Sequence, residues 1–274
     1  MGGVAAQVTS LSRLQPIRRD RPVGRYAPSP TGDLHLGNLR TALVAWEDCR
    51  RRGGIFILRI EDIDRPRVVP GAEERLLDDL RWLGIDWDEG PDVGGPAAPY
   101  RQSERGDIYA AALEALEGRG LTYLCTCSRK DLQEASAPHP PLDAGPFAPE
   151  GPVYPGTCRR ADPVLQRSDP RGAAARLRVD AQPVIGFEDL ALGRLEADLR
   201  TLCGDFVIRR RDGLWAYQLA CAVDDALMGV THVVRGRDLL SSTPRQIVLQ
   251  RLLGLPVPKF EHVPLVLDGD GRRM

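Results

Sequence analysis

A loop at residues 25–38 combines side chains and a setting that suit phosphate chemistry. It lies between an apolar strand signal and a helix, and ligands of open α/β sheets bind at that end of a strand. Backbone N–H groups at a helix N-terminus attract phosphate oxygens, Gly37 permits close approach, and His35 can hydrogen-bond charge that develops on a transferring phosphoryl oxygen. The G-x-G-x-x-G and Walker patterns are absent. These residues predict a nucleotide site, although alone they also fit an ordinary capped turn.

Three cysteines could bind a metal ion. Cys125 and Cys127 follow a strand-like segment, and Cys158 comes after a proline-rich stretch. Closely spaced thiolates suit tetrahedral Zn²⁺, but a C-x-C pair alone is equally compatible with partly buried cysteines. The remaining thiols are interpreted as core or surface residues and two histidines stay unassigned: Cys49, Cys203, Cys221, His139 and His232.

Alternating strands and helices are expected to position the loop. Strand signals at 23–27 and 55–60 flank a helix that ends near Gly53, and the second strand is continuously apolar, as in a parallel sheet. Two helices and a strand are then indicated, at 76–83, 103–118 and 122–125. The first 125 residues predict a doubly wound α/β sheet of the Rossmann type.

The middle of the chain differs in composition from the first 125 residues. Residues 137–155 contain seven prolines, which excludes regular helix or central strand there. Strand and hairpin signals at 176–179 and 184–195 predict a separate lobe. Alternation then resumes, and the last helix is expected to have Thr243 as its N-cap, followed by Pro244. The resumed elements are expected at 206–208, 218–223, 231–235 and 243–254.

Composition fits a soluble globular enzyme. Apolar residues make up 42% of the 274, and no apolar run approaches the ~18 residues that suggest a membrane span. The net charge of −1 does not by itself indicate a nucleic-acid binder, because affinity for phosphate comes from local clusters of Lys and Arg. We expect no secretory signal at the N-terminus, because residues 1–20 contain no sustained apolar stretch. We expect a cytoplasmic monomer that binds no membrane.

Residues 25–38 resemble the first signature of the glutamyl-type class I aminoacyl-tRNA synthetases. The likeness continues in the family's order through 59–64, 215–225 and 234–246, and it spans roughly Arg21 to Met274. It implies a Rossmann-type doubly wound parallel sheet with an inserted zinc-containing α+β lobe, in an enzyme that uses L-glutamate, ATP with Mg²⁺ and tRNA. The expected divisions are an N-terminal tail, the first half of the catalytic domain, the inserted lobe with the zinc site and the second half: 1–20, 21–124, 125–204 and 205–274.

The resemblance also implies roles for single residues. Arg25 and Arg235 would hold carboxylates, and Glu61 would hold the α-ammonium group. Tyr217 would donate a hydrogen bond in the same pocket. A substrate with two carboxylates and one ammonium needs two cations and an acid, and the planar fork of arginine suits carboxylates. Ala27 and Ser29 would line the glutamate pocket, His35 and Asn38 would be catalytic, and the ATP contacts would be Pro28, His35, Gly37, Asn38 and Arg273.

The end of the chain resembles the opening of the second family signature, with Arg273 where a lysine is common. We expect a truncated fragment. The implied zinc ligands are those of short catalytic-domain paralogues, in which tyrosine is the unusual fourth ligand: Cys125, Cys127, Tyr154 and Cys158. Those paralogues attach glutamate to queuosine in the anticodon loop of tRNA(Asp), and they lack an anticodon-binding domain, which the resemblance leads us to expect here as well. Arg159, Arg160 and Arg171 are candidates for tRNA phosphate contacts.

Three other functions remain open. The chain could be the catalytic fragment of a glutamyl-tRNA synthetase that charges the 3′ end of tRNA(Glu). It could be a catalytically silent paralogue that binds nucleotide or tRNA, although such a module has no reason to keep both arginines and Glu61. Another adenylate-forming nucleotidyltransferase is disfavoured, because paired arginines would be wasted on a single carboxylate.

Overall fold

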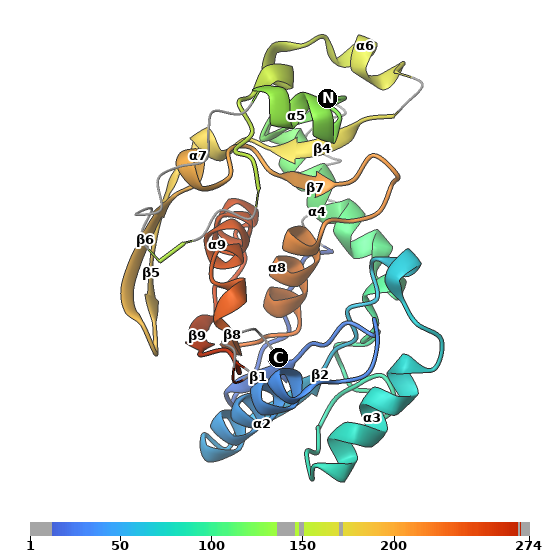
Figure 1. Ribbon diagram of the computed structural model, residues 1–274, viewed down its shortest axis with the longest axis vertical. Coiled ribbons are helices and arrows are strands. Elements are labelled where there is room, and N and C mark those ends of the chain that lie inside the picture. The colour runs from blue at the N-terminus through green and yellow to red at the C-terminus, as the bar shows by residue number, and fades with distance from the viewer. Residues whose placement is uncertain (1–12, 136–145, 148–150, 170–171, 268, 270–274) are drawn as a thin grey trace.

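The computed structural model describes residues 13–135, 146–147, 151–169, 172–267 and 269 (Figure 1). Its strands are β1 (Val23–Tyr26), β2 (Ile55–Leu58), β3 (Thr122–Cys125), β4 (Ala174–Leu177), β5 (Val184–Asp189), β6 (Gly193–Asp198), β7 (Val207–Arg209), β8 (His232–Gly236) and β9 (Lys259–Val263). Its α-helices are α2 (Leu36–Arg51), α3 (Ala72–Trp82), α4 (Gly106–Gly118), α5 (Arg129–Ala135), α6 (Pro163–Arg167), α7 (Leu199–Leu202), α8 (Tyr217–Leu227) and α9 (Ser242–Leu253). Short 3₁₀ helices are η1 (Arg65–Arg67), η2 (Gln102–Glu104), η3 (Thr157–Arg160), η4 (Val179–Ala181) and η5 (Arg237–Leu239).

The parallel strands come from both ends of the chain, as the resumed alternation predicted. β1 pairs with β2 in parallel, and β8 pairs with β9 in parallel. A main-chain hydrogen bond of 2.9 Å from Thr231 to the Val23 carbonyl joins the start of β8 to β1. Helix α2 fills the β1–β2 crossover, so the loop before it lies at the carboxyl end of β1, where ligands of such sheets bind.

A second sheet corrects three assignments made from the sequence. β3, expected to close the first parallel unit, pairs antiparallel with β4. β7, expected at 206–208 in the resumed alternation, pairs antiparallel with the other edge of β4 and does not join the parallel strands. Conversely, the β5–β6 hairpin, expected in the separate lobe, joins the parallel strands where Asp189 pairs with Phe260 of β9. The strand β9 was not anticipated. Figure 1 shows α8 and α9 standing between the upper sheet and the parallel strands.

Two apolar cores hold these layers together. The larger core joins α4, α8 and α9 to strands of both sheets, and it includes Tyr109, Leu177 and Phe260. The smaller core packs α2 and α3 against β2, around Phe56 and Leu80. Leu14 and Ile17 of the segment expected as a tail also pack on the larger core, and the Ile17 N–H donates to the Leu227 carbonyl. No helix among the described residues is long and apolar enough to cross a membrane.

The start of α9 differs from the predicted cap. Ser241, not Thr243, occupies the N-cap position, and no side chain caps this end. The Thr243 hydroxyl is fully buried and accepts a hydrogen bond of 2.7 Å from Nη2 of Arg235. The prediction was wrong because a buried arginine competes for the hydroxyl that the sequence pattern assigned to the helix backbone.

Candidate active site

The loop between β1 and α2 ends in a capping box. His35 is extended, with φ −99° and ψ 168°, and its Nδ1 accepts from the Asn38 N–H at 3.4 Å. The Asn38 Oδ1 accepts in return from the His35 N–H at 3.3 Å. Because Nδ1 is an acceptor, the proton of the neutral ring lies on Nε2 and can be donated to a ligand. The His35 side chain is exposed toward solvent.

A cleft of about 780 Å³ opens beside this loop. It is lined by residues from the ends of β1, β2, β8 and β9 and from the first turns of α2 and α8. Every described residue expected in the glutamate and ATP sites lines it: Arg25, Ala27, Pro28, Ser29, His35, Gly37, Asn38, Glu61, Tyr217 and Arg235. Arg273 lies outside the described residues.

Arg235 is a buried cation that contacts neutral groups. Its Nε donates to His262 Nε2 at 3.1 Å, its Nη1 to Gln246 Oε1 at 2.7 Å, and its Nη2 to the Thr243 hydroxyl at 2.7 Å. Among the described residues it forms no ion pair. Burial and the neighbouring Arg25 lower the pKa of Arg235, against the opposing effect of Tyr217. The guanidinium therefore retains an uncompensated charge at the wall of the cleft.

Arg25, the second arginine expected to hold a carboxylate, lies on β1, next to the strand β8 that carries Arg235. Its Nη1 donates to the Val234 carbonyl at 3.1 Å, and its Nε lies 3.4 Å from Asp225 Oδ1. The same Asp225 oxygen accepts a shorter bond of 2.7 Å from Nη1 of Arg59. Arg25 thus shares one carboxylate with a second arginine, which leaves it only partly neutralised.

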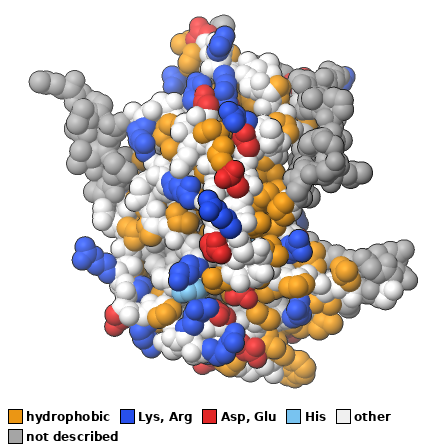
Figure 2. All heavy atoms as spheres, turned by 90° about the vertical axis from the view of Figure 1, so that its left-hand side faces the viewer, with side chains coloured by type: hydrophobic (Ala, Val, Ile, Leu, Met, Phe, Trp, Pro, Cys, Tyr) orange, Lys and Arg blue, Asp and Glu red, His pale blue; other side chains and the backbone are white. Residues whose placement is uncertain are grey.

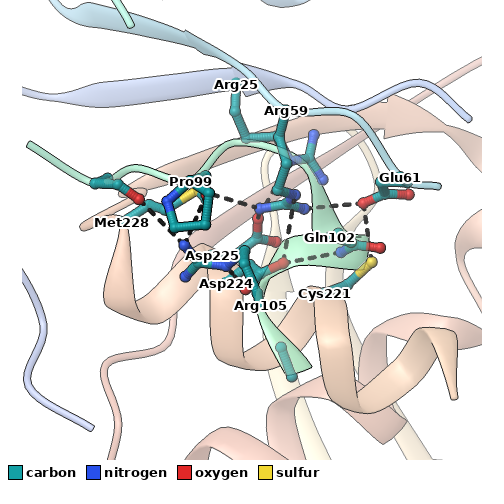
Figure 3. A network of polar contacts seen from close by, with 12 residues as sticks. Arg25, Arg59, Glu61, Pro99, Gln102, Arg105, Cys221, Asp224, Asp225 and Met228 are labelled. Carbon is teal, nitrogen blue, oxygen red and sulfur yellow. Dashed lines mark hydrogen bonds and ion pairs between the residues drawn. The ribbon is translucent and has the colours of Figure 1, made fainter. Parts of the chain in front are cut away.

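Arg59 organises the acidic wall of the site (Figure 3). It is fully buried at the end of β2, and its Nη2 donates to Glu61 Oε1 at 3.0 Å. Burial alone would lower the pKa of Arg59, but Asp225, Glu61 and Asp224 raise it well above its ordinary value. Asp224 is paired more closely with Arg105, at 2.7 Å. The network fixes the carboxylate of Glu61 at the cleft.

Two side chains of α8 complete this wall. Tyr217 is the first residue of the helix and is half-buried. Burial, followed by Cys221 and Glu61, raises the pKa of Tyr217 well above its ordinary value, so its phenol stays protonated and can donate. Cys221, interpreted from the sequence as a core or surface residue, is buried, and its Sγ donates to Glu61 Oε1 at 3.0 Å. It is a buried contact of the site.

The expected metal ligands also converge. The sulfurs of Cys125, Cys127 and Cys158 lie within 4.8 Å of one another. The Tyr154 hydroxyl is 3.4 Å from Cys125 Sγ and accepts from the Cys158 N–H at 2.9 Å. The Arg176 guanidinium lies 3.8 Å from the centre of the Tyr154 ring.

The pKa values of two of these thiols are shifted in opposite directions. Burial and hydrogen bonding with Cys158 raise the pKa of Cys127 to about 12. Burial acts the same way on Cys158, but hydrogen bonds from the Thr126 backbone and Tyr154 outweigh it and lower the pKa of that thiol to about 7. The cluster therefore contains one thiol that is readily ionised and one that stays protonated without a positive charge nearby.

The approach of Tyr154 depends on one glycine. Tyr154 pairs with Gly204, whose φ is +64°. A Cβ at residue 204 would lie 2.3 Å from the Tyr154 carbonyl oxygen, so only glycine allows this contact.

The arginines expected at tRNA phosphate differ in their surroundings, and the sequence reasoning missed some residues of the site. Arg159, expected at tRNA phosphate, is committed to Asp205, with Nη2 2.6 Å from Oδ1, whereas Arg160 is exposed. Arg171 and His139 lie outside the described residues. The residues that anchor the arginines were not anticipated: Asp189, Asp225, Gln246 and His262. A usable signal existed for Arg59, since a charge inside an apolar strand must have buried partners.

Comparisons with known proteins agree with this geometry. The family described as tRNA synthetases class I (E and Q), catalytic domain, matches residues 23–274. A Glutamyl-Q tRNA(Asp) synthetase of Symbiobacterium thermophilum is 55% identical over 255 residues, which are 92% of this chain and 76% of that protein. Glutamate--tRNA ligase 1 of Halorhodospira halophila is 49% identical over 251 residues, 90% of this chain and 51% of that protein.

A solved structure matches as well. The glutamate tRNA ligase of Elizabethkingia meningosepticum, in complex with its amino acid, superposes with a TM-score of 0.79 at 35% identity. The match covers 93% of this chain and 52% of that one. The chain thus spans about half the length of that ligase.

Proposed function

Because the chain belongs to the class I tRNA synthetases of the E and Q type, we propose that it activates L-glutamate with ATP and transfers the glutamyl group to queuosine in the anticodon loop of tRNA(Asp). The relatives named for that reaction are 45–55% identical to the chain over 90% or more of its length, which supports this acceptor.

One observation carries the choice of glutamate: the donors of Arg235 are only partly used. An arginine has five N–H groups, and three of them go to His262, Gln246 and Thr243. Two remain, one on each terminal nitrogen. Together with the uncompensated charge, this pair suits a substrate carboxylate, bound in the bidentate manner that arginine favours.

The other groups fit the rest of the amino acid. Arg25 is suited to the second carboxylate, since it shares its acid with Arg59. Glu61, held from behind by Arg59, is an acceptor for the α-ammonium group. Tyr217 supplies a neutral hydrogen-bond donor between them, with Ala27 and Ser29 on the same wall.

The proposed reaction is attack of the glutamate α-carboxylate on the α-phosphorus of ATP. The new C–O–P linkage forms as the bond to the β-phosphate oxygen breaks, and pyrophosphate leaves. His35 Nε2–H and the backbone amides at the start of α2 are placed to stabilise charge on the phosphate oxygens, with Gly37 and Asn38 allowing close approach. Mg²⁺ bound to the ATP phosphates would neutralise part of that charge. The protein's contribution is orientation and electrostatics.

We also propose that Cys125, Cys127, Tyr154 and Cys158 bind Zn²⁺. Three thiols and a phenol form a tetrahedral set of suitable donor types. Burial raises the pKa of Tyr154 well above its ordinary value, so its phenolate would form only with a bound cation. The Cys158 N–H donates to the phenol oxygen and would stabilise that phenolate. A cation would likewise stabilise the thiolate of Cys127, which burial disfavours. The role of this ion is structural, because its ligands belong to the β3–β4–β7 side of the molecule.

The second candidate acceptor is the 3′ end of tRNA(Glu). The 49% identity to a glutamate--tRNA ligase favours it, and both candidates share the adenylation step. The acceptor therefore needs its own experiment.

The amino-acid assignment is tested by ATP–pyrophosphate exchange with full-length protein, with glutamate, glutamine and aspartate compared and no tRNA added. We expect exchange with glutamate. Arg235→Ala should reduce kcat/KM by about tenfold to a hundredfold, since a charge-assisted hydrogen bond contributes about 1.5–3 kcal/mol. Arg81→Ala, a change at an exposed arginine, is the control. Equal exchange with glutamine would remove the case for the arginine pair.

A further inference from the structure

The orientation of Arg235 is set by a buried chain of hydrogen bonds that begins on the β5–β6 hairpin. Asp189, the last residue of β5, places Oδ2 2.6 Å from Nδ1 of His262. Nε2 of the same imidazole lies 3.1 Å from Nε of Arg235. The side chains of Asp189 and His262 are fully buried, so neither can contact substrate directly.

In this series of hydrogen bonds, each donor and acceptor is fixed. A carboxylate only accepts, so the proton of the imidazole is held on Nδ1 and Nε2 remains an acceptor. Nε2 can then accept a hydrogen bond from Nε–H of Arg235, since a guanidinium can only donate. The Thr243 hydroxyl completes the arrangement, 3.0 Å from Nε2 and 2.7 Å from Nη2 of Arg235. Burial, followed by Arg235 itself, lowers the pKa of His262 to about 4, which keeps the ring neutral.

Asp189 and His262 also join the β5–β6 hairpin to strand β9. Asp189 pairs with Phe260 in the sheet, and its Oδ1 accepts from the N–H groups of Ala191 and Leu192 in the hairpin turn. The rings of Phe260 and His262 are stacked at 12°, and the Arg235 guanidinium lies 5.2 Å from the Phe260 centroid. A shift of the hairpin end would therefore move the arginine.

We infer that Asp189 and His262 are positioning residues that make the site select glutamate over its neutral amide. The inference rests on the proposed function. The bond to Nε fixes the plane of the guanidinium and thereby aims the two unused N–H groups at one carboxylate. If the acceptor at Nε2 is lost, the guanidinium can tilt, and the bidentate contact weakens while ATP contacts at the α2 loop stay intact.

Matched variants separate positioning from simple destabilisation. Asp189→Asn keeps the shape but can donate to Nδ1, which places the imidazole proton on Nε2 opposite the N–H of Arg235. His262→Asn keeps a donor to Asp189 and loses the acceptor to Arg235. His262→Gln can place Oε1 near the position of Nε2 and should rescue part of the effect. Glu188→Gln, an exposed change one residue earlier on β5, is the control.

Each protein would be assayed by ATP–pyrophosphate exchange, with saturation by glutamate, glutamine and ATP, and by calorimetric binding of glutamate alone. For Asp189→Asn and His262→Asn we expect the KM for glutamate to rise about tenfold or more, with the KM for ATP changed less than about twofold. The preference for glutamate over glutamine should fall by a similar factor. Glu188→Gln should match the wild type.

The outcomes are distinguishable. A wild-type protein that does not prefer glutamate overturns the proposed function and this inference together. A wild-type preference that persists unchanged in folded Asp189→Asn and His262→Asn overturns the inference alone. If Asp189→Asn does not fold because the hairpin turn is lost, the two His262 variants decide, since they leave the bonds of Asp189 to Ala191 and Leu192 in place. Equal losses in His262→Asn and His262→Gln for glutamate and ATP alike would indicate a structural role and reject the proposal.

Discussion

The balance of buried charges around the cleft is uneven. Arg59 contacts both Glu61 and Asp225, and Arg25 shares Asp225 with it. Arg235 contacts neutral groups and reaches the buried carboxylate of Asp189 only through His262. A carboxylate of glutamate would give Arg235 a direct anionic partner, whereas glutamine would leave this buried cation facing a neutral amide. Rejection of the amide therefore follows from desolvation as well as from lost hydrogen bonds.

Asp225 is the acid on which this balance depends, and its removal is expected to destabilise the fold. In Asp225→Asn, Arg59 and Arg25 lose the carboxylate that they share. Breaking a buried ion pair on one side costs about 3–5 kcal/mol, whereas an exposed acid contributes about 0–1 kcal/mol. Asp78→Asn, in a surface pair whose acid is 78% exposed, is the control. Denaturant unfolding at pH 7 measures both, and equal stabilities would contradict the role assigned to Asp225.

The same acid predicts a pH dependence. Burial raises the pKa of Asp225, but Arg59 and Arg25 outweigh it and hold that pKa below its ordinary value. A depressed folded-state pKa contributes stability above the unfolded value of about 3.9, and this contribution is lost as pH falls through the folded-state pKa. Asp225→Asn should therefore lose less stability than the wild type between about pH 5 and 3. Parallel curves of Tm against pH would exclude this linkage.

At the scale of elements, local sequence patterns predicted where helices and strands lie better than they predicted which strands pair. The strands at β1 and β2 and the helices α2, α3, α4 and α8 follow from apolar spacing, and they occur where the sequence predicted them within a few residues. The partner of β3 did not follow, because its apolar pattern fits an antiparallel lobe as well as a parallel sheet. Nor could the role of the Thr243 hydroxyl in α9 be predicted, since Arg235, which donates to it, lies on β8.

In the site, too, some residues could be predicted from the sequence and others could not. The residues of the cleft could be predicted because four short motifs in the family's order place them at strand ends and helix starts. Their anchors could not, since Asp189 and His262 are 73 residues apart and meet only through the contact of β5 with β9. Nonlocal hydrogen bonds leave no periodic pattern in a sequence.

The metal cluster is expected to hold one zinc ion per chain and to stabilise the lobe that contains β3. Cys127→Ser should abolish zinc in elemental analysis and lower the Tm of a lobe transition, while glutamate binding changes little, because Cys127 contacts no residue of the cleft among those described. Cys203→Ser, at a thiol bonded to the Leu199 carbonyl, is the control. Wild-type protein that is free of metal and has freely reactive thiols would contradict this site.

A second variant tests the geometry of the cluster without touching a ligand. Gly204→Ala should displace Tyr154 and weaken metal retention, because the new Cβ would overlap the Tyr154 carbonyl. Gly213→Ala is the matched control, since it has a similar φ of +85° but nothing within 4 Å of the added Cβ. Backbone strain of about 1 kcal/mol is common to both, so a difference in zinc content reports the close contact.

At the scale of the whole molecule, the net charge of −1 gives no general attraction for RNA. On the face shown in Figure 2, Lys and Arg side chains are interleaved with Asp and Glu. Binding of tRNA would therefore depend on local clusters of Lys and Arg. Affinity for tRNA should accordingly be modest and sensitive to salt.

The acceptor is the property that the cleft leaves to experiment. A base of an anticodon loop can be turned out of its stack at small cost, so it could be presented to an adenylate held in the cleft. The cyclopentene diol of queuosine presents a hydroxyl comparable to the ribose hydroxyl at a tRNA 3′ end. Either hydroxyl could attack the carbonyl carbon of the adenylate and release AMP, so the shape of the reactive group alone does not choose between them.

We predict that radiolabelled glutamate is transferred to tRNA(Asp) that contains queuosine, and not to tRNA(Asp) with guanosine at that position. Removal of the 3′-terminal adenosine beforehand should leave labelling intact, because that adenosine supplies no part of the proposed acceptor. Nuclease digestion should then recover the label in the anticodon fragment. Label confined to the 3′-terminal adenosine of tRNA(Glu) would instead assign the chain to the glutamate--tRNA ligase reaction, with the glutamate pocket unchanged. Transfer to neither RNA, despite glutamate-dependent exchange, would reject both acceptors while the adenylation step stands.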